Sequence, residues 1–163
     1  MAHAAKYTKS ASGHLMAHYE RLKVKDPKTG EYEYIKFGNQ DIDPSRTHLN
    51  YNLAPEREGG QMDFLRQRLS ECKVLNRADV NVMCSWVVTL PKFEPVNKNI
   101  HVTPDKEKIS KLFFERTYRF IADRYGENNI ISAYVHRDEH EDHMHCPFVP
   151  VMYDDKTGGE KVC

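Results

Sequence analysis

The sequence lacks any long hydrophobic run. A membrane-spanning helix needs about 20 consecutive apolar residues, and no stretch of the 163-residue chain approaches that length. The N-terminal stretch MAHAAKYTKSASGH also lacks the apolar centre of a secretory signal peptide. We therefore expect a cytoplasmic protein without a membrane segment.

Cysteine is scarce and widely spaced. The four cysteines, Cys72, Cys84, Cys146 and Cys163, form no C-x-x-C pair. In a chain without an export signal, such thiols are expected to stay reduced. We predict structural thiols and no disulfide framework.

Net charge is absent as well, because 24 lysines and arginines balance 24 aspartates and glutamates. A global field therefore cannot attract nucleic acid, and any such attraction must come from local patches. Residues 1–30 form one basic patch, with six lysines or arginines against two acidic residues.

The apolar periodicity predicts one α+β domain over residues 1–163, with a largely antiparallel sheet and flanking helices. The hydrophobic content of 39% is enough for a single core. Strand character is found in residues 81–91, 129–137 and 143–153. Helices are predicted at residues 61–72 and, shorter, within residues 12–23. Residues 25–46 have the turn residues of hairpins or a long loop, and only residues 32–37 are strand-like.

The clearest helical signal follows Thr103, which suits an N-cap, and Pro104, which suits a first turn. Gly126 is expected to end this helix. Its apolar positions at helical spacing are Ile109, Leu112, Phe113, Phe120 and Ile121.

The stretch HRDEHEDHMH, residues 136–145, places four histidines and four carboxylates within ten residues. In a strand, residues two apart point to the same face, so His143 and His145 project together while Met144 points into apolar packing. A hairpin closing through RDEHED brings His136 beside this pair. We predict that the three imidazoles bind one divalent cation and leave coordination positions for water or phosphate oxygens.

The carboxylates between these histidines are expected to form an acidic rim around the cation: Asp138, Glu139, Glu141 and Asp142. Glu139 is our candidate for a proton acceptor, and His140 is expected to be solvated at the hairpin tip. Such a site suits hydrolysis or phosphoryl transfer. Two alternatives remain open: an exposed His-x-His without metal, and a DNA-binding regulator whose metal only stabilises the fold.

The histidine stretch resembles the H-x-D-E-x-x-P-H-M-H motif of plasmid mobilisation relaxases of the Mob/Pre (MOBV) type, in the HUH endonuclease superfamily. Two more stretches match in the same order. AHYER, residues 17–21, resembles that family's H-N-x-R motif, and DIDPSRTHLNYNL, residues 41–53, resembles its D-I-N-P-S-R-S-H-L-N-Y-[ED]-L segment. With SWVVT and RYGENNI, the resemblance covers residues 7–150.

The resemblance implies a relaxase catalytic domain in the bacterial cytoplasm, built on an antiparallel sheet that carries the histidine triad. Its implied activity is metal-dependent, site- and strand-specific nicking and strand transfer at a plasmid origin of transfer, through a covalent 5′-phosphoryl–protein intermediate. The implied partner is plasmid DNA in single-stranded or hairpin form. Mn²⁺ or Mg²⁺ is the implied metal; the histidine ligands leave Zn²⁺, Co²⁺ or Ni²⁺ as alternatives. Family members are usually longer, so an N-terminal catalytic portion is expected.

The resemblance also assigns a nucleophile. His18 occupies the motif's histidine, and Arg21, three residues further along a helix, lies at the distance needed to brace the scissile phosphate. Tyr19 stands where the family has asparagine and is the alternative nucleophile, since other HUH enzymes use tyrosine. A neutral imidazole attacks directly, whereas a phenol must first lose its proton, so His18 is preferred. Two further departures are Asn52 in place of an acidic residue and Asp142 in place of the proline.

DNA contacts are predicted in the basic N-terminal region and in residues 41–53. Phosphate contacts are expected from lysine and arginine side chains: Lys6, Lys9, Lys23, Lys25, Arg46 and Arg57. Tyrosine and histidine rings, among them Tyr7, are available to stack on unpaired bases. The resemblance adds His48, Asn50 and Tyr51 as further DNA-contact residues.

Overall fold

A central antiparallel sheet organises the protein, seen in a computed structural model that describes residues 1–35, 41–92 and 105–163. The sheet has the strand order β1-β5-β7-β6-β4, and each neighbouring pair is antiparallel. Its strands are β1 (Ala2–Thr8), β4 (Tyr51–Asn52), β5 (Asn81–Thr89), β6 (Tyr134–His136) and β7 (His143–Phe148). The predicted α+β class with an antiparallel sheet is confirmed.

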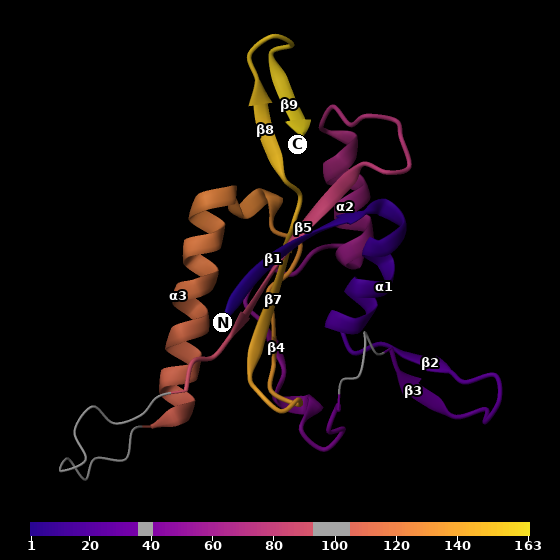
Figure 1. Cartoon of the computed structure of the whole chain (residues 1–163), viewed down its shortest axis with the longest axis vertical. Helices are drawn as coiled ribbons and strands as arrows, with labels where there is room; N and C mark the ends of the chain where they lie inside the picture. Colours follow the sequence, from indigo (N-terminus) through magenta and orange to yellow (C-terminus); the bar gives the residue numbers. More distant parts are fainter. Residues whose placement is uncertain (36–40, 93–104) are drawn as a thin grey trace.

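Helices cover both faces of this sheet (Figure 1). They are α1 (Lys9–Tyr19), α2 (Gly60–Ser70) and α3 (Lys106–Tyr125), with the short 3₁₀ turns η1 (Thr47–Leu49) and η2 (Glu127–Asn129). On one face, Phe114 and Ile121 of α3 pack in a cluster with Met144 of β7. On the other face, Leu15 of α1 and Leu65 of α2 share a second cluster with β5. The site described below lies on the face that α1 and α2 cover.

Strand β7 shows the predicted alternation. Met144 and Cys146 are fully buried in the cluster with α3, so the intervening His143 and His145 point to the opposite face. Two predicted strands are shorter than expected. Only Tyr134–His136 of residues 129–137 forms a strand, and residues 143–153 divide into β7 and β8 (Val151–Asp154).

Two small hairpins extend from the body (Figure 1). Strand β8 pairs with β9 (Gly159–Val162), and β2 (Lys23–Lys25) pairs with β3 (Tyr32–Tyr34). The second hairpin confirms the strand-like character of residues 32–34, while residues 36 and 37 of that prediction lie outside the described part. The helices predicted at residues 61–72 and within 12–23 correspond to α2 and α1.

Helix α3 begins differently from the prediction. Its N-cap is Asp105, whose carboxylate accepts a hydrogen bond from the Lys108 backbone N–H at 3.1 Å. The expected cap Thr103 and Pro104 lie outside the described residues. Gly126 ends the helix as predicted, with a φ of 86° that favours glycine.

The apolar face predicted for α3 is partly wrong. Leu112 and Phe120 are 46% and 64% exposed, while Phe114 and Tyr118 are buried against the sheet. All four cysteines are free thiols, as predicted. Among the described helices, none is long and apolar enough to cross a membrane.

Candidate active site and metal centre

Three histidine rings meet on the α1 side of the sheet. Strand register places His136, at the end of β6, directly opposite His143 on β7, and His145 follows two residues later on the same face. The ring centroids of His136 lie 5.3 Å from His143 and 4.9 Å from His145, and those of His143 and His145 are 4.9 Å apart. The structure thus brings together the three side chains that the sequence singled out as metal ligands.

The hydrogen bonds of these rings leave nitrogen lone pairs facing inward. His136 Nε2 lies 2.9 Å from the Tyr19 carbonyl oxygen, which can only accept, so we assign the proton to Nε2 and the lone pair to Nδ1. His143 Nδ1 lies 2.8 Å from the Glu141 carbonyl oxygen, which leaves Nε2 as its lone-pair atom. His136 Nδ1 and both nitrogens of His145 are buried without a hydrogen-bond partner among the described residues.

This donor set fits a cation. Buried polar atoms without partners are costly, and a metal ion bound by one nitrogen of each ring would satisfy His136 Nδ1 and one of the two nitrogens of His145. Burial, with the charge of Arg21 adding to it, lowers the pKa of His136 to about 3. Burial also holds the pKa of His145 well below its usual value. Both rings are therefore neutral near pH 7, as metal ligands must be.

Two groups of possible ligands share His136. The first is His18, His136 and His145, and the second is His136, Glu139 and His143. Within each group the ligand atoms lie within 4.8 Å of one another. Glu139 Oε1 lies 3.8 Å from His136 Nδ1 and 3.8 Å from His143 Nε2. The Glu139 carboxylate therefore faces the same point as the two lone pairs. It is available as a further ligand or as a proton acceptor beside the metal.

His18 approaches this cluster from the last turn of α1. Its ring centroid lies 5.5 Å from that of His136 and 5.7 Å from that of His145. Its Nδ1 lies 3.1 Å from the Ile35 carbonyl oxygen, which assigns the proton to Nδ1 and the lone pair to Nε2. Burial lowers the pKa of His18, and the hydrogen bond to Ile35 only partly offsets this. The ring is therefore neutral, and its Nε2 lone pair faces Arg21 Nη1 at 3.4 Å.

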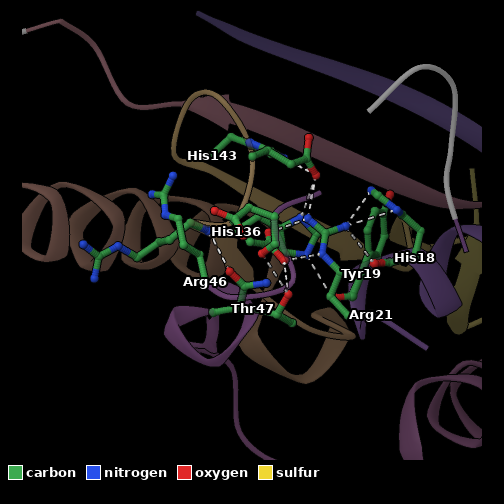
Figure 2. A network of polar contacts seen from close by, with 12 residues as sticks. His18, Tyr19, Arg21, Arg46, Thr47, His136 and His143 are labelled. Atoms are coloured by element: carbon green, nitrogen blue, oxygen red, sulfur yellow. Dashed lines mark hydrogen bonds and ion pairs between the residues drawn. The ribbon is translucent and has the colours of Figure 1, made fainter. Parts of the chain in front are cut away.

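Arg21 joins His18 to the loop between β6 and β7 (Figure 2). Its Nε and Nη2 donate to the two carboxylate oxygens of Asp138 at 3.0 and 2.7 Å, and Nη2 also contacts Glu139 Oε1 at 2.5 Å. Its Nη1 lies 3.4 Å from His18 Nε2. Arg21 has a φ of 57°, in the left-handed region that non-glycine residues rarely adopt. The hydrogen bonds hold its guanidinium between His18 and the carboxylates of Asp138 and Glu139.

Asp138 is not part of an acidic rim, contrary to the expectation from sequence. Its side chain is fully buried. Burial alone raises its pKa, but hydrogen bonds and charge from Arg21 outweigh this and bring the pKa to about 2. Asp138 is thus an ionised anchor for Arg21, while Glu141 remains exposed at the loop.

Residues 41–53 support the loop between β6 and β7 through hydrogen bonds. Thr47 Oγ1 donates to Asp138 Oδ2 at 3.0 Å, and Asp43 N donates to the Asp138 carbonyl at 2.8 Å. Asn50 Oδ1 accepts from the Arg137 N–H at 2.7 Å. The sequence argument missed Asp43 and Thr47 as supporting residues, and only the length of the matching segment could have indicated them.

The predicted DNA-contact residues have different surroundings. Lys6 and His48 are exposed, and Tyr7 and Tyr51 are half-buried. Arg46 has a side chain 43% exposed and lies 3.9 Å from Asp142. These five lie at or near the surface, whereas Asn50 is engaged by the Arg137 backbone.

Arg57, also predicted to contact phosphate, instead forms contacts within the protein. Its Nη2 donates to the carbonyls of Glu127 and Ile130 at 2.9 and 2.7 Å. The guanidinium also lies 4.2 Å from the centroid of the Phe64 ring. These contacts tie Arg57 to the protein itself.

Tyr19 belongs to the wall of the site. Its ring stacks on His145 with centroids 4.5 Å apart, and its hydroxyl donates to Ser85 Oγ at 3.2 Å. The residue is 2% exposed, and burial raises the pKa of its phenol above the usual value. The Tyr19 hydroxyl is therefore directed to β5. Of the adjacent residues His18 and Tyr19, only His18 directs a nucleophilic atom toward the histidine cluster.

A cavity of about 320 Å³ opens beside the cluster. Its lining includes His18, His143 and His145, together with Tyr7 and Val87. His3 and Thr89, which the sequence argument did not select, also line it. The cavity gives a ligand access to both the nucleophile candidate and the predicted metal position.

Comparison with known proteins identifies the family. The whole chain, residues 1–163, matches the Mob_Pre family, described as plasmid recombination enzyme. The chain belongs to this family. A plasmid recombination enzyme of Streptococcus agalactiae is 36% identical over 129 residues, covering 76% of the chain and 24% of that protein. One from Bacillus sp is 36% identical over 155 residues, covering 86% of the chain and 35% of that protein. The chain thus spans about a quarter to a third of these Mob_Pre relatives.

Solved Mob_Pre structures share the fold. The MobM relaxase domain (MOBV; Mob_Pre), in a Mn-bound crystal structure at pH 6.8 with plasmid pMV158 oriT DNA, is 30% identical with a TM-score of 0.68. The match covers 97% of this chain and 75% of that one. A Mn-bound structure of the same domain at pH 4.6, also with oriT DNA, is 29% identical with a TM-score of 0.68.

Proposed function

We propose that this chain is a metal-dependent DNA relaxase domain that nicks and transfers one strand at a plasmid origin of transfer. The observation that carries the proposal is the meeting of a neutral His18 with three inward-facing imidazoles at one open cavity. Membership of the Mob_Pre family and the oriT DNA bound to the MobM relaxase domain support it.

His136 Nδ1, His143 Nε2 and His145 are the proposed metal ligands. When bound, a divalent cation polarises the scissile phosphate and stabilises the negative charge that develops on it. The Mn-bound MobM structures support a divalent cation such as Mn²⁺. Mg²⁺ is proposed from the family resemblance, with Zn²⁺, Co²⁺ or Ni²⁺ as alternatives on a histidine-rich site.

His18 is the proposed nucleophile. Its Nε2 lone pair attacks the phosphorus, a P–N bond forms and the P–O3′ bond breaks, and the proton that the imidazole loses ends on the leaving oxygen as a 3′-hydroxyl. The Ile35 carbonyl holds the ring orientation through Nδ1. Arg21 Nη1, beside the attacking nitrogen, is placed to stabilise phosphate charge.

Glu139 is the proposed acceptor of the His18 proton. In the structure its carboxylate contacts Arg21 rather than His18. Its role therefore requires the carboxylate to turn from Arg21 toward the imidazole when the substrate neutralises that arginine. The Glu139 side chain keeps 12% of its surface exposed.

The alternative nucleophile, Tyr19, is less well placed. Its hydroxyl is hydrogen-bonded to Ser85 and its pKa is raised by burial. A tyrosine attack would need the ring to leave its stack on His145. The remaining alternative is a DNA-binding regulator in which the metal only stabilises the fold.

The deciding experiment incubates the protein with Mn²⁺ and a supercoiled plasmid carrying its own origin of transfer. We expect a nicked circle and a protein–DNA adduct that acid destroys, because a phosphoramidate is acid-labile. His18→Ala should abolish the adduct and Tyr19→Phe should retain it. An acid-stable adduct that forms in His18→Ala but not in Tyr19→Phe would assign the nucleophile to Tyr19. No nick and no adduct from the wild-type chain would support the regulator.

A further inference from the structure

The hairpin of β2 and β3 carries two kinds of side chain on opposite faces. It projects from the end of α1, the helix that carries His18 (Figure 1). Its register pairs Lys23 with Tyr34 and Lys25 with Tyr32. Because directly opposed residues and residues two apart share a face, these four side chains lie together. We call this the Lys/Tyr face: Lys23, Lys25, Tyr32 and Tyr34.

The opposite face has the other charge. Val24 pairs with Glu33 there, and the backbone pairing continues through the Asp26 N–H and the Glu31 carbonyl at 2.8 Å. Continued alternation places Asp26 and Glu31 on the side of Glu33. The two strands of the hairpin therefore separate Lys23 and Lys25 from the carboxylates, although the total charge of the hairpin is small.

The Lys/Tyr face is open to solvent. Tyr32 is 67% exposed, both lysines are exposed, and Tyr34 is half-buried. Lys23 Nζ lies 4.7 Å from the centroid of the Tyr34 ring, so cation and ring form one continuous surface. In the described part of the chain, neither lysine forms an ion pair within 4.0 Å with a carboxylate. Both charges are free for an outside anion.

Single-stranded DNA is the partner that this chemistry fits. Exposed aromatic rings stack on unpaired bases regardless of sequence, and lysines contact the phosphates between them. In a duplex the base faces are already stacked on one another, so the two tyrosines gain nothing from it. The Lys/Tyr face therefore fits a partner that has both negative phosphates and exposed base faces, and an unpaired DNA strand has both.

The base of the hairpin is connected to the site. The Ile35 N–H, one residue after β3, donates to the Leu22 carbonyl at 2.9 Å, and the Ile35 carbonyl contacts His18 Nδ1 at 3.1 Å. We propose that the Lys/Tyr face binds the unpaired DNA strand that continues from the scissile phosphate at His18. This inference rests on the proposed function, because that function supplies the strand.

The test measures binding of fluorescein-labelled oligonucleotides by anisotropy in EDTA, so that no nicking occurs. The strand spans the chain's own origin of transfer, and the same sequence is also tested as a duplex. The double variant Tyr32→Ala/Tyr34→Ala should weaken single-strand binding about tenfold and duplex binding much less. The double variant Lys23→Gln/Lys25→Gln should lower the slope of log K against log salt by about 1.4, since each single-strand phosphate contact contributes about 0.7.

The matched control is Val24→Ser/Glu33→Gln, on the opposite face of the same hairpin, which should bind as the wild type does. Circular dichroism checks that all variants fold. A 5-iodouracil photo-crosslink in the wild type should map to the tryptic peptide that contains Tyr32.

The outcomes separate this inference from the proposed function. Wild-type protein that binds and nicks the strand, with Lys/Tyr-face variants that bind equally well, would overturn the inference alone. The inference would also be overturned if variants of the two hairpin faces lost equal affinity for the single strand. Equal losses of affinity for duplex and single strand in a Tyr32→Ala/Tyr34→Ala protein would overturn it too. A wild-type chain that neither nicks nor binds an unpaired strand would remove the proposed function, and the inference with it.

Discussion

Arg21 and Asp138 form a buried bidentate ion pair across 117 residues of sequence, with donor–acceptor distances of 3.0 and 2.7 Å. The pair joins the end of α1, which carries His18, to the loop between β6 and β7, the two strands that carry the predicted metal ligands. Thr47 adds a third attachment to the same carboxylate. The relative position of nucleophile and metal thus depends on one buried aspartate.

Asp138→Asn should therefore be both destabilising and less active. Removing one partner of a buried ion pair costs up to about 3–5 kcal/mol, and Glu139, which also contacts Arg21, offsets part of this cost. Denaturant unfolding should report this loss, and nicking should fall because Arg21 is no longer held beside His18. The control is Asp63→Asn, which breaks an exposed pair with Arg66 and should cost less than about 1 kcal/mol. Equal effects of the two substitutions would contradict the anchoring role.

Each histidine of the predicted triad should be needed for metal binding. Alanine at His136, His143 or His145 removes one of three ligands, so titration calorimetry with Mn²⁺ should show affinity reduced by at least about tenfold, and nicking should be lost. His140→Ala is the matched control, since His140 is exposed on the same loop. Unchanged Mn²⁺ binding in all three variants would exclude this ligand set.

Chelation should remove activity but leave the fold. The sheet is held by two apolar clusters that do not depend on a metal, in contrast to a zinc-stapled module that unfolds when its metal is removed. Circular dichroism in EDTA should therefore show a cooperative melt, and single-stranded DNA binding should persist with a steep salt dependence. Loss of secondary structure in EDTA would favour the regulator.

Tyr19→Phe should affect stability more than chemistry. The substitution keeps the stack on His145 but leaves Ser85 Oγ without its partner, which costs about 1–3 kcal/mol when the remaining group is buried. Thermal unfolding should report that loss, while adduct formation at a temperature where the variant is folded should proceed. Ser85→Ala should show a similar stability loss from the other side of the bond. A folded Tyr19→Phe protein without adduct would argue for a direct role of the phenol.

Short-range sequence patterns predicted the part of the site whose residues lie close together in the sequence. The His-x-His alternation and the closing hairpin are short-range features, so the meeting of His136, His143 and His145 could be predicted from the strand period and one turn. The fold class followed in the same way from periodic segments.

Long-range contacts could not be predicted from such patterns. Nothing near Arg21 in the sequence indicates Asp138 as its partner, and the expected acidic rim was wrong for that residue. Which side of α3 is buried also depends on the surface it meets. Leu112 and Phe120 fit the helical spacing, yet the sheet contacts Phe114 and Tyr118 instead.

Strand β7 carries its apolar residues on one face and its histidines on the other. A shift of its pairing by one residue would turn His143 and His145 into the core and expose Met144 and Cys146 to water. A chain with this one-residue slip would therefore lose its metal ligands and its core together. Packing of the core thus selects against the slip that would destroy the site.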